Sequence, residues 1–163
     1  MRIGVVSDTH NNLKNIDKII SLFNKEDISF VIHTGDITNA SALEKFTQLN
    51  SKLIGVYGNN DRNEKGLKEV AKKYNFQFQE PPKLLSLCKK NIAIFHEPEL
   101  IEDFLLKKEK IDIVIHGHTH RFRQEVKSDV LFFNPGESAG WLEGSNAIGV
   151  IDLVANTARR IFF

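Results

Sequence analysis

The sequence predicts an α/β protein in which two β-sheets pack together and helices cover the outside. Up to His120, short runs of branched apolar residues alternate with stretches in which apolar residues recur at helical spacing. From Phe122 onward, strand-like runs are joined by short polar turns instead. A strand–helix half followed by a strand-only half indicates two packed sheets with helices on their outer faces.

Buried strands are predicted by five short apolar runs, because each run is brief and ends in polar residues or glycine. These runs are Ile3–Val6, Phe30–Ile32, Leu53–Val56, Ile92–Phe95 and Ile113–Ile115. The later strands are expected at Phe122–Val126, Val130–Phe133, Ala147–Leu153 and Arg159–Phe163.

Helices are predicted between the strands from apolar residues three and four positions apart. Their apolar stripes run over Leu13–Phe23, Leu43–Leu49, Leu67–Tyr74 and Leu100–Leu105. Ser41 and Glu44 have the spacing of a capping box, which would begin the second helix at Ser41. Lys107, Lys108 and Lys110 would end the fourth helix, where the helix dipole favours cations.

Composition limits the class of protein. Of the 163 residues, 41% are apolar and 26% are charged, which is typical of a soluble globular protein with a single domain over residues 1–163. The net charge of +1 gives no support for nucleic-acid binding or for a membrane-surface domain. The only cysteine, Cys88, excludes an internal disulfide, and no apolar run reaches the ~18–20 residues of a membrane span. We therefore expect a cytoplasmic protein that does not enter membranes.

Polar motifs follow five of the predicted strands. They are Asp8-Thr9-His10, Gly35-Asp36, Gly58-Asn59-Asn60-Asp61, His96 and Gly117-His118-Thr119-His120. Loops beyond the carboxyl ends of strands converge in α/β proteins, so we expect these motifs to meet in one crevice. Their donors are oxygen and imidazole nitrogen without thiolate, which favours Mn²⁺, Fe, Zn²⁺, Ni²⁺ or Co²⁺ over the all-oxygen shells of Ca²⁺ or Mg²⁺.

The number of candidate ligands indicates more than one ion. The seven are Asp8, His10, Asp36, Asn59, His96, His118 and His120. Two ions with a bridging carboxylate, at the ~3.5–4 Å separation typical of two-metal hydrolases, would use them all. Two divalent ions carry four positive charges, and two aspartates with a bridging hydroxide carry three negative charges. The site therefore keeps a net charge of about +1, which suits a small anionic phosphate ester.

The ordered set of motifs, D-x-H, G-D, G-N-x-D, a lone His and G-H-x-H, resembles the calcineurin-like metallophosphoesterase superfamily. The compact length, Ile32-His33-Thr34-Gly35-Asp36 and Asn134-Pro135-Gly136-Glu137-Ser138 are similar to its small YfcE-type phosphodiesterase branch. The resemblance spans residues 3–153. It implies a four-layer α/β/β/α sandwich of two mixed sheets flanked by helices.

The resemblance also implies two divalent ions and a role for each ligand. Mn²⁺ is the metal expected first, with Ni, Zn, Fe, Co or Mg as alternatives. Three residues would hold the first ion: Asp8, His10 and His120. Three would hold the second: Asn59, His96 and His118. Asp36 would bridge the ions, and a hydroxide between them would attack the phosphorus of a phosphodiester.

Two positions depart from the family pattern. Many relatives carry His after the G-N dipeptide, where it can protonate the leaving oxygen, whereas this chain has Asn60. An amide cannot deliver a proton, so general acid catalysis, typically ~10²–10⁴-fold, is expected to be weaker unless Asp61 supplies the proton. Glu97-Pro98 replaces the usual Gly after the lone His96, which makes that loop bulkier and stiffer.

Other interpretations stay open. The same site could hydrolyse phosphomonoesters, or the chain could be a non-catalytic scaffold on the same fold. Asp61 could orient a neighbouring group or cap a helix, and His33 and His116 are expected to support ligands or pack rather than to bind metal. Ser138 could contact a phosphate oxygen. Ala139–Leu142 could offer an apolar surface to a substrate base or to a second copy in a homo-oligomer, or could simply cover the edge of the core.

Overall fold

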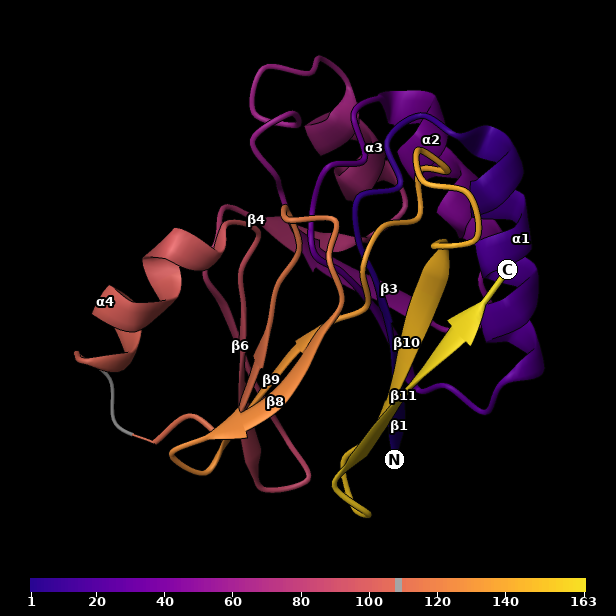
Figure 1. The fold of residues 1–163 in the computed structure, drawn as a ribbon. Helices are drawn as coiled ribbons and strands as arrows, with labels where there is room; N and C mark the ends of the chain where they lie inside the picture. Colours follow the sequence, from indigo (N-terminus) through magenta and orange to yellow (C-terminus); the bar gives the residue numbers. More distant parts are fainter. Residues whose placement is uncertain (108–109) are drawn as a thin grey trace.

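Two mixed β-sheets pack face to face in the computed structural model, which describes residues 1–107 and 110–163 (Figure 1). Helices cover the outer face of each sheet, so the layers follow the order α/β/β/α. The predicted α/β fold and its four layers are therefore confirmed. Lys108, expected at the end of the fourth helix, lies outside the described residues.

The first sheet is parallel through its centre, in the order β11-β10-β1-β2-β3-β4. Its parallel strands are β1 (Arg2–Val6), β2 (Phe30–His33), β3 (Lys52–Val56) and β4 (Gln77–Gln79). β10 (Ala147–Asp152) pairs antiparallel with β1, and β11 (Thr157–Phe162) pairs antiparallel with β10. The carboxyl ends of β1, β2 and β3 thus lie side by side at one edge.

The second sheet has the order β5-β6-β7-β9-β8. Its parallel strands are β6 (Lys90–Ile94), β7 (Ile113–Ile115) and β9 (Val130–Asn134). Antiparallel strands flank them, β5 (Lys83–Leu87) beside β6 and β8 (Arg123–Lys127) beside β9. Here too, the carboxyl ends of three parallel strands are neighbours.

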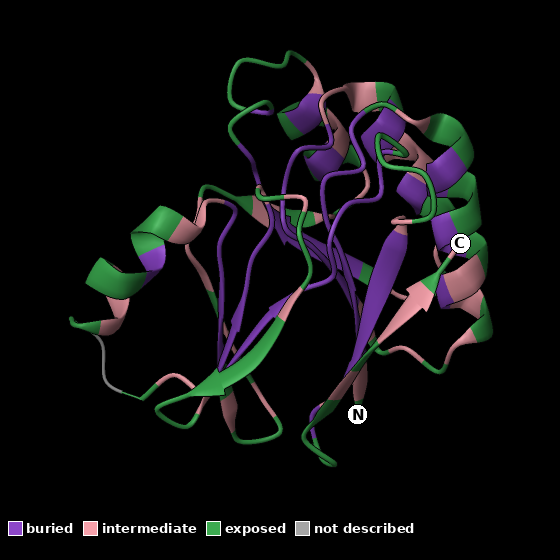
Figure 2. Cartoon of the chain, in the orientation of Figure 1, coloured by how far each residue is buried: buried purple, intermediate pink, exposed green. Residues whose placement is uncertain are grey.

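Apolar side chains form three buried clusters between these elements. Figure 2 shows that buried residues make up most of the strands inside each sheet. The central cluster lies between the two sheets, and it includes the fully buried Ile3, Ile32, Ile92 and Ile115. The first sheet is covered by α1 (Leu13–Lys25), α2 (Ala40–Lys45), the 3₁₀ turn η1 (Phe46–Gln48) and α3 (Leu67–Lys73). The second is covered by the 3₁₀ turn η2 (Pro98–Leu100) and α4 (Ile101–Leu105). Among residues 1–107 and 110–163, no helix is long and apolar enough to cross a bilayer.

The start of α2 differs from the prediction. Asn39 is the N-cap, and its Oδ1 accepts a hydrogen bond from the backbone N–H of Ala42 at 2.7 Å. Ser41 lies inside the helix, where its hydroxyl donates to the same Asn39 oxygen at 2.9 Å. The capping box expected at Ser41 and Glu44 is therefore wrong, because an asparagine two residues earlier caps the helix about as well as serine does.

The predicted strands all occur, with ends that shift by no more than two residues. β4 and β5 were not predicted. β4 is only three residues long and two of them are glutamine, and β5 alternates half-buried with exposed residues. Both strands lie at a sheet edge, where one neighbour supplies the backbone pairing and a long apolar run is not required.

Candidate metal centre

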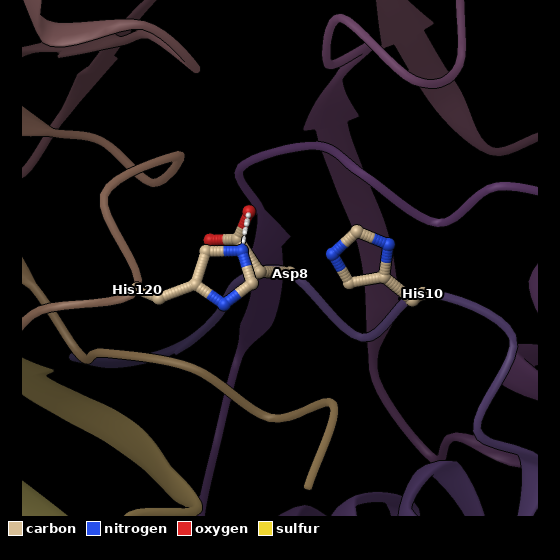
Figure 3. Close-up of side chains that lie close together, drawn as sticks. All are labelled: Asp8, His10 and His120. Atoms are coloured by element: carbon tan, nitrogen blue, oxygen red, sulfur yellow. Dashed lines mark ion pairs between the residues drawn. The ribbon is translucent and has the colours of Figure 1, made fainter. Parts of the chain in front are cut away.

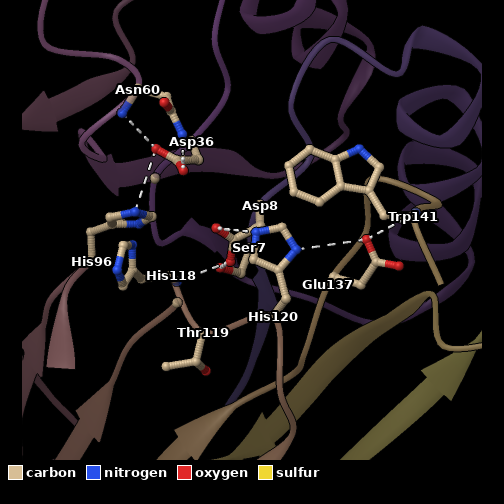
Figure 4. Close-up of polar contacts among 12 residues, drawn as sticks. Ser7, Asp8, Asp36, Asn60, His96, His118, Thr119, His120, Glu137 and Trp141 are labelled. Carbon is tan, nitrogen blue, oxygen red and sulfur yellow. Dashed lines mark hydrogen bonds and ion pairs between the residues drawn. The ribbon is translucent and has the colours of Figure 1, made fainter.

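Loops from both sheets meet at one edge of the sandwich (Figure 4). Hydrogen bonds join the two sets of loops directly. His96 Nδ1 lies 2.8 Å from the carbonyl oxygen of Thr34, and the backbone N–H of His118 donates to Asp8 Oδ2 at 3.1 Å. The convergence expected for loops that follow parallel strands is therefore observed.

The first candidate metal group comprises Asp8, His10 and His120 (Figure 3). One potential ligand atom from each residue lies within 4.8 Å of the others, and Asp8 Oδ1 is 3.5 Å from His120 Nε2. Asp8 and His10 follow β1 in the first sheet, whereas His120 follows β7 in the second. The group therefore needs both sheets to form.

Two atoms of this group, Asp8 Oδ1 and His10 Nε2, are buried and have no hydrogen-bond partner among residues 1–107 and 110–163. Leaving a buried polar atom unpaired costs about 1–3 kcal/mol, so such atoms are uncommon and require an explanation. A carboxylate oxygen and an imidazole nitrogen are both ligands of divalent cations. The residues present thus fit a metal ion that would satisfy both atoms.

The second set of candidate ligands surrounds His96. Its Nε2 lies 3.4 Å from Asp36 Oδ1 and 2.9 Å from Asn59 Oδ1. The Nδ1 of His118 lies 3.0 Å from the same Asn59 oxygen. The structure therefore brings the remaining sequence-predicted ligands, Asp36, Asn59, His96 and His118, into contact with one another.

Asp8 lies between the two sets, because its carboxylate is also within 4.8 Å of ligand atoms of Asp36 and His96. The resemblance implies Asp36 as the bridge. In this structure both oxygens of Asp36 accept hydrogen bonds from Asn60, Oδ1 from the backbone N–H at 3.0 Å and Oδ2 from the side-chain amide at 2.7 Å. Asn60, one of the two residues considered for catalysis, therefore positions the Asp36 carboxylate.

The backbone is strained at five of the candidate ligands. Left-handed φ angles occur at Asp8 (51°), His10 (45°), Asp36 (58°), His118 (68°) and His120 (57°). Such angles are uncommon for residues other than glycine and cost free energy that the surrounding structure must supply. Their concentration on the residues that converge here indicates a functional site.

Burial and charge shift the pKa values of the site in opposing ways. Burial works to raise the pKa of Asp36, but hydrogen bonding and charge from His96, with the Asn60 donors, hold that pKa below its ordinary value. Burial works to lower the pKa of His96, but Asp36 raises it above its ordinary value. Burial raises the pKa of Asp8 and lowers that of His10. For Asp8 and His10, burial thus outweighs the charges of the neighbouring residues, and a bound cation would favour ionised Asp8 and neutral His10.

Asp61, the other residue considered for catalysis, is 4% exposed and is saturated with backbone donors. Its Oδ2 accepts the N–H groups of Asp36 and Gly58, and its Oδ1 accepts those of Ile37 and Thr38, all at 2.8 Å. Burial raises the pKa of Asp61, while these donors oppose the rise. With every oxygen engaged, the Asp61 carboxyl caps the loop that carries Asp36.

Histidines 33 and 116 support the loops, as expected from their positions. His33 Nδ1 accepts the N–H of Gly35 at 3.1 Å, and His33 Nε2 lies 3.0 Å from Thr9 Oγ1. Burial lowers the pKa of His33 to about 3, so the ring is neutral. His116 Nδ1 lies 3.1 Å from the Gly117 carbonyl oxygen. Both rings therefore contact the backbone beside ligands rather than the ligand cluster itself.

Sequence reasoning considered Ala139–Leu142 as a surface for substrate and used Glu137 in a family motif, but it did not place Glu137 or Trp141 beside the candidate ligands (Figure 4). Glu137 is fully buried, and its Oε2 lies 3.9 Å from His120 Nδ1. The Trp141 ring stacks on the rings of His10 and His120. Glu137 follows the carboxyl end of β9, so the rule that identified the other motifs could have found it. Nothing in the spacing of Trp141 indicates its place.

Two further expectations are resolved by contacts. Ser138 is fully buried and its hydroxyl donates to the carbonyl oxygen of Ala147 at 3.2 Å, so it does not face the candidate ligands.

The loop that begins Glu97-Pro98 is joined to the loop after β3, because Arg62 donates to Glu97 Oε1 at 2.6 Å. The bulkier residue after His96 thus ties two ligand-bearing loops together.

Comparison with known proteins finds a matching family and two similar phosphodiesterases. The family model of the calcineurin-like phosphoesterase superfamily domain matches residues 1–156. Phosphodiesterase MJ0936 of Methanocaldococcus jannaschii is 38% identical over 165 residues, which cover 99% of this chain and 98% of that protein. Phosphodiesterase YfcE of Escherichia coli K12 is 24% identical over 168 residues, which cover 93% of this chain and 88% of that protein.

A solved structure carries the same fold over its full length. It is that of an archaeal phosphodiesterase, with a TM-score of 0.90 and 36% sequence identity, and the match covers 100% of both chains. The resemblance drawn from the motifs is thereby confirmed. This chain belongs to the calcineurin-like phosphoesterase superfamily.

Proposed function

We propose that this protein is a phosphodiesterase that uses two divalent metal ions. The observation that carries the proposal is the convergence of seven oxygen and imidazole ligands from both sheets. Two of their atoms are buried without a hydrogen bond to any residue that the structure describes. Single-ion sites need fewer ligands than these loops present. The ligand set has no thiolate and is rich in imidazole, which favours Mn²⁺ with Ni, Zn, Fe, Co or Mg as alternatives.

The proposed roles follow the motifs. Asp8, His10 and His120 would hold the first ion. Asn59, His96 and His118 would hold the second, and Asp36 would be shared by the two. When bound, the ions supply a water of lowered pKa as the nucleophile and stabilise negative charge on the phosphoryl oxygens.

The neighbouring residues of this chain keep the ligands in place. Asn60 holds both oxygens of Asp36, and Asp61 holds the backbone N–H of the same residue. Neither is free to protonate a leaving oxygen, since Asn60 is an amide and every oxygen of Asp61 is engaged. We therefore assign both a positioning role and expect esters with acidic leaving groups to react fastest.

The diester preference rests on the activities named for MJ0936 and YfcE. The residual positive charge expected for the loaded site matches a singly charged diester. Phosphomonoesters are the alternative substrates of the same ligand set, and only kinetics separates the two classes.

A screen of metals against substrates tests the proposal. Metal-stripped protein is reloaded with Mn, Ni, Zn, Fe, Co or Mg in turn and assayed on bis(p-nitrophenyl) phosphate and p-nitrophenyl phosphate. We expect about two ions per chain after Mn²⁺ loading and faster hydrolysis of the diester. Less than one bound ion with no hydrolysis of either ester would instead identify a non-catalytic scaffold.

A matched pair of variants assigns the activity to the site. Asp36→Asn should abolish turnover and lower the bound metal while the circular dichroism spectrum stays unchanged. Asp27→Asn removes a carboxylate whose side chain is 94% exposed and should leave both properties as they are. Full activity in Asp36→Asn would refute the assignment.

The proposal includes a single domain over residues 1–163 in the cytoplasm. The two sheets share one buried layer of side chains. Cys88 is an exposed free thiol, which suits a reducing compartment.

A further inference from the structure

The Trp141 ring lies against the first candidate metal group. Its centroid is 4.3 Å from that of His10 and 4.7 Å from that of His120, and the planes are inclined by 30° and 15°. These are stacked contacts with two of the three ligands of the first group. A substrate bound to that group would therefore lie beside the indole.

Both imidazoles lie on the same face of the indole. Two rings stacked on opposite faces would be separated by at least about 7 Å, twice the contact distance between carbon atoms. The centroids of His10 and His120 are only 5.5 Å apart. The opposite face of the indole is therefore turned away from the ligands, and Trp141 is 65% exposed.

The indole is largely exposed, so packing of the ring contributes little to its position. Hydrogen bonds to the backbone of its loop hold it in place instead. The N–H groups of Trp141 and Leu142 donate to the buried Glu137 carboxylate at 3.3 and 2.8 Å. On the other side, the Asn12 amide donates to the carbonyl oxygen of Ala139 at 2.7 Å. The chain thus keeps a large aromatic surface in water at a fixed place beside the ligands. Such a surface is suited to binding a flat ring.

We propose that the outer face of Trp141 binds a flat aromatic ester group of the substrate, either a simple aryl group or a nucleobase. The inference rests on the proposed phosphodiesterase function and names the substrate class for that site. Aromatic side chains stack on any base, because every base has a π-face, so this contact selects flat groups over alkyl groups without reading a base sequence.

Two diesters with one leaving group test the inference. Bis(p-nitrophenyl) phosphate and ethyl p-nitrophenyl phosphate release the same nitrophenolate and differ in the group that stays on phosphorus. Trp141→Ala should lower the ratio of their kcat/KM values, aryl over ethyl, by about tenfold. Trp141→Phe should keep most of the ratio. Leu142→Ala, on the same loop and 58% exposed in the wild type, is the matched control and should leave the ratio unchanged.

A binding measurement gives a readout independent of turnover. Trp141 is the only tryptophan in the chain, so intrinsic fluorescence reports on this ring alone. Phenylphosphonate should change the emission of the Mn²⁺-loaded protein more strongly than methylphosphonate does. Equal responses to the two phosphonates would overturn the inference.

The outcomes separate this inference from the function on which it rests. No hydrolysis of either diester by the wild type rejects the proposed function. Hydrolysis of both with the same ratio in wild type and Trp141→Ala rejects the stacking role alone. Thymidine 5′-(p-nitrophenyl phosphate) distinguishes the two sources of a flat ring. A larger Trp141→Ala effect on that ester than on the bis-aryl ester assigns nucleotide diesters, and a smaller effect assigns simple aryl groups.

Discussion

The Asp61 carboxylate accepts the backbone N–H of Asp36 at 2.8 Å, across 25 residues of sequence. Asp36 has a left-handed φ of 58°, a conformation that its loop must be forced to keep. A second oxygen of Asp61 holds the next two backbone N–H groups of the same loop. A buried acid outside the ligand cluster thus fixes the backbone of a candidate bridging ligand.

Asp61→Asn should destabilise the protein and weaken metal binding. The amide group would face two of the four backbone N–H donors, which would lose their acceptor, at a cost of about 2–4 kcal/mol. Urea denaturation measures the loss, and a metal titration measures the affinity. If Asp61 were instead a general acid, the variant would keep its stability and lose activity selectively on esters with poor leaving groups.

Asn60→His tests whether a missing proton donor limits the rate. An imidazole can protonate a leaving alkoxide, whereas the amide of Asn60 cannot. We expect the variant to accelerate hydrolysis of alkyl diesters by about tenfold or more while nitrophenyl esters change little. The backbone N–H of residue 60 still bonds Asp36 Oδ1, so bound metal should be retained, which elemental analysis checks. An equal change for both classes of ester would argue against a proton-transfer role.

Sequence reasoning located the candidate ligands because a short apolar run followed by polar residues predicts where a strand ends. Asp8, Asp36 and His96 each follow an apolar run, and parallel pairing brings the carboxyl ends of such runs to one edge. The two packed sheets with helices on their outer faces follow from the same pattern, and the four-layer order was implied by the family resemblance. Elements of this kind are specified by neighbouring residues and can be predicted from them.

The missing parts depend on contacts between distant residues. Four donors converge on Asp61 from residues 36, 37, 38 and 58, and nothing in Gly58-Asn59-Asn60-Asp61 indicates that the first three would reach it. Trp141 lies against His10 and His120 in a loop that is bonded to Glu137 and to the distant Asn12. β4 is held by pairing with β3 rather than by its own composition.

Asn39→Ala and Ser41→Ala should separate the observed cap of α2 from the one predicted. Asn39 Oδ1 accepts the N–H of Ala42, so its loss should cost about 1 kcal/mol. Ser41 only donates to that same oxygen, so Ser41→Ala should change the free energy of unfolding by a few tenths of a kcal/mol. Urea denaturation of the two variants provides the comparison. A larger loss of unfolding free energy for Ser41→Ala than for Asn39→Ala would show that the capping box at Ser41 and Glu44 stabilises the helix after all.

Because of His33, the protein should become less stable as the pH falls below about 6.5. Its Nδ1 accepts the Gly35 N–H, so in the neutral ring the proton is on Nε2 and is donated to Thr9 Oγ1. Burial lowers the pKa of this ring to about 3, whereas an unfolded histidine titrates near 6.5. Between these values the unfolded chain binds more protons than the folded chain. The free energy of unfolding therefore rises with pH, and this contribution is lost as the pH falls from about 6.5 toward 3.

His33→Asn keeps an acceptor close to the position of Nδ1 and does not titrate. Urea denaturation of metal-free protein at pH 7 and pH 5 should show a loss for the wild type that exceeds the loss for the variant by about 2 kcal/mol. A smaller dependence should persist in His33→Asn, because burial also lowers the pKa of His116, to about 4. Parallel losses in wild type and variant would show that His33 is protonated in the folded protein, and its hydrogen bond from Gly35 would then have to be abandoned.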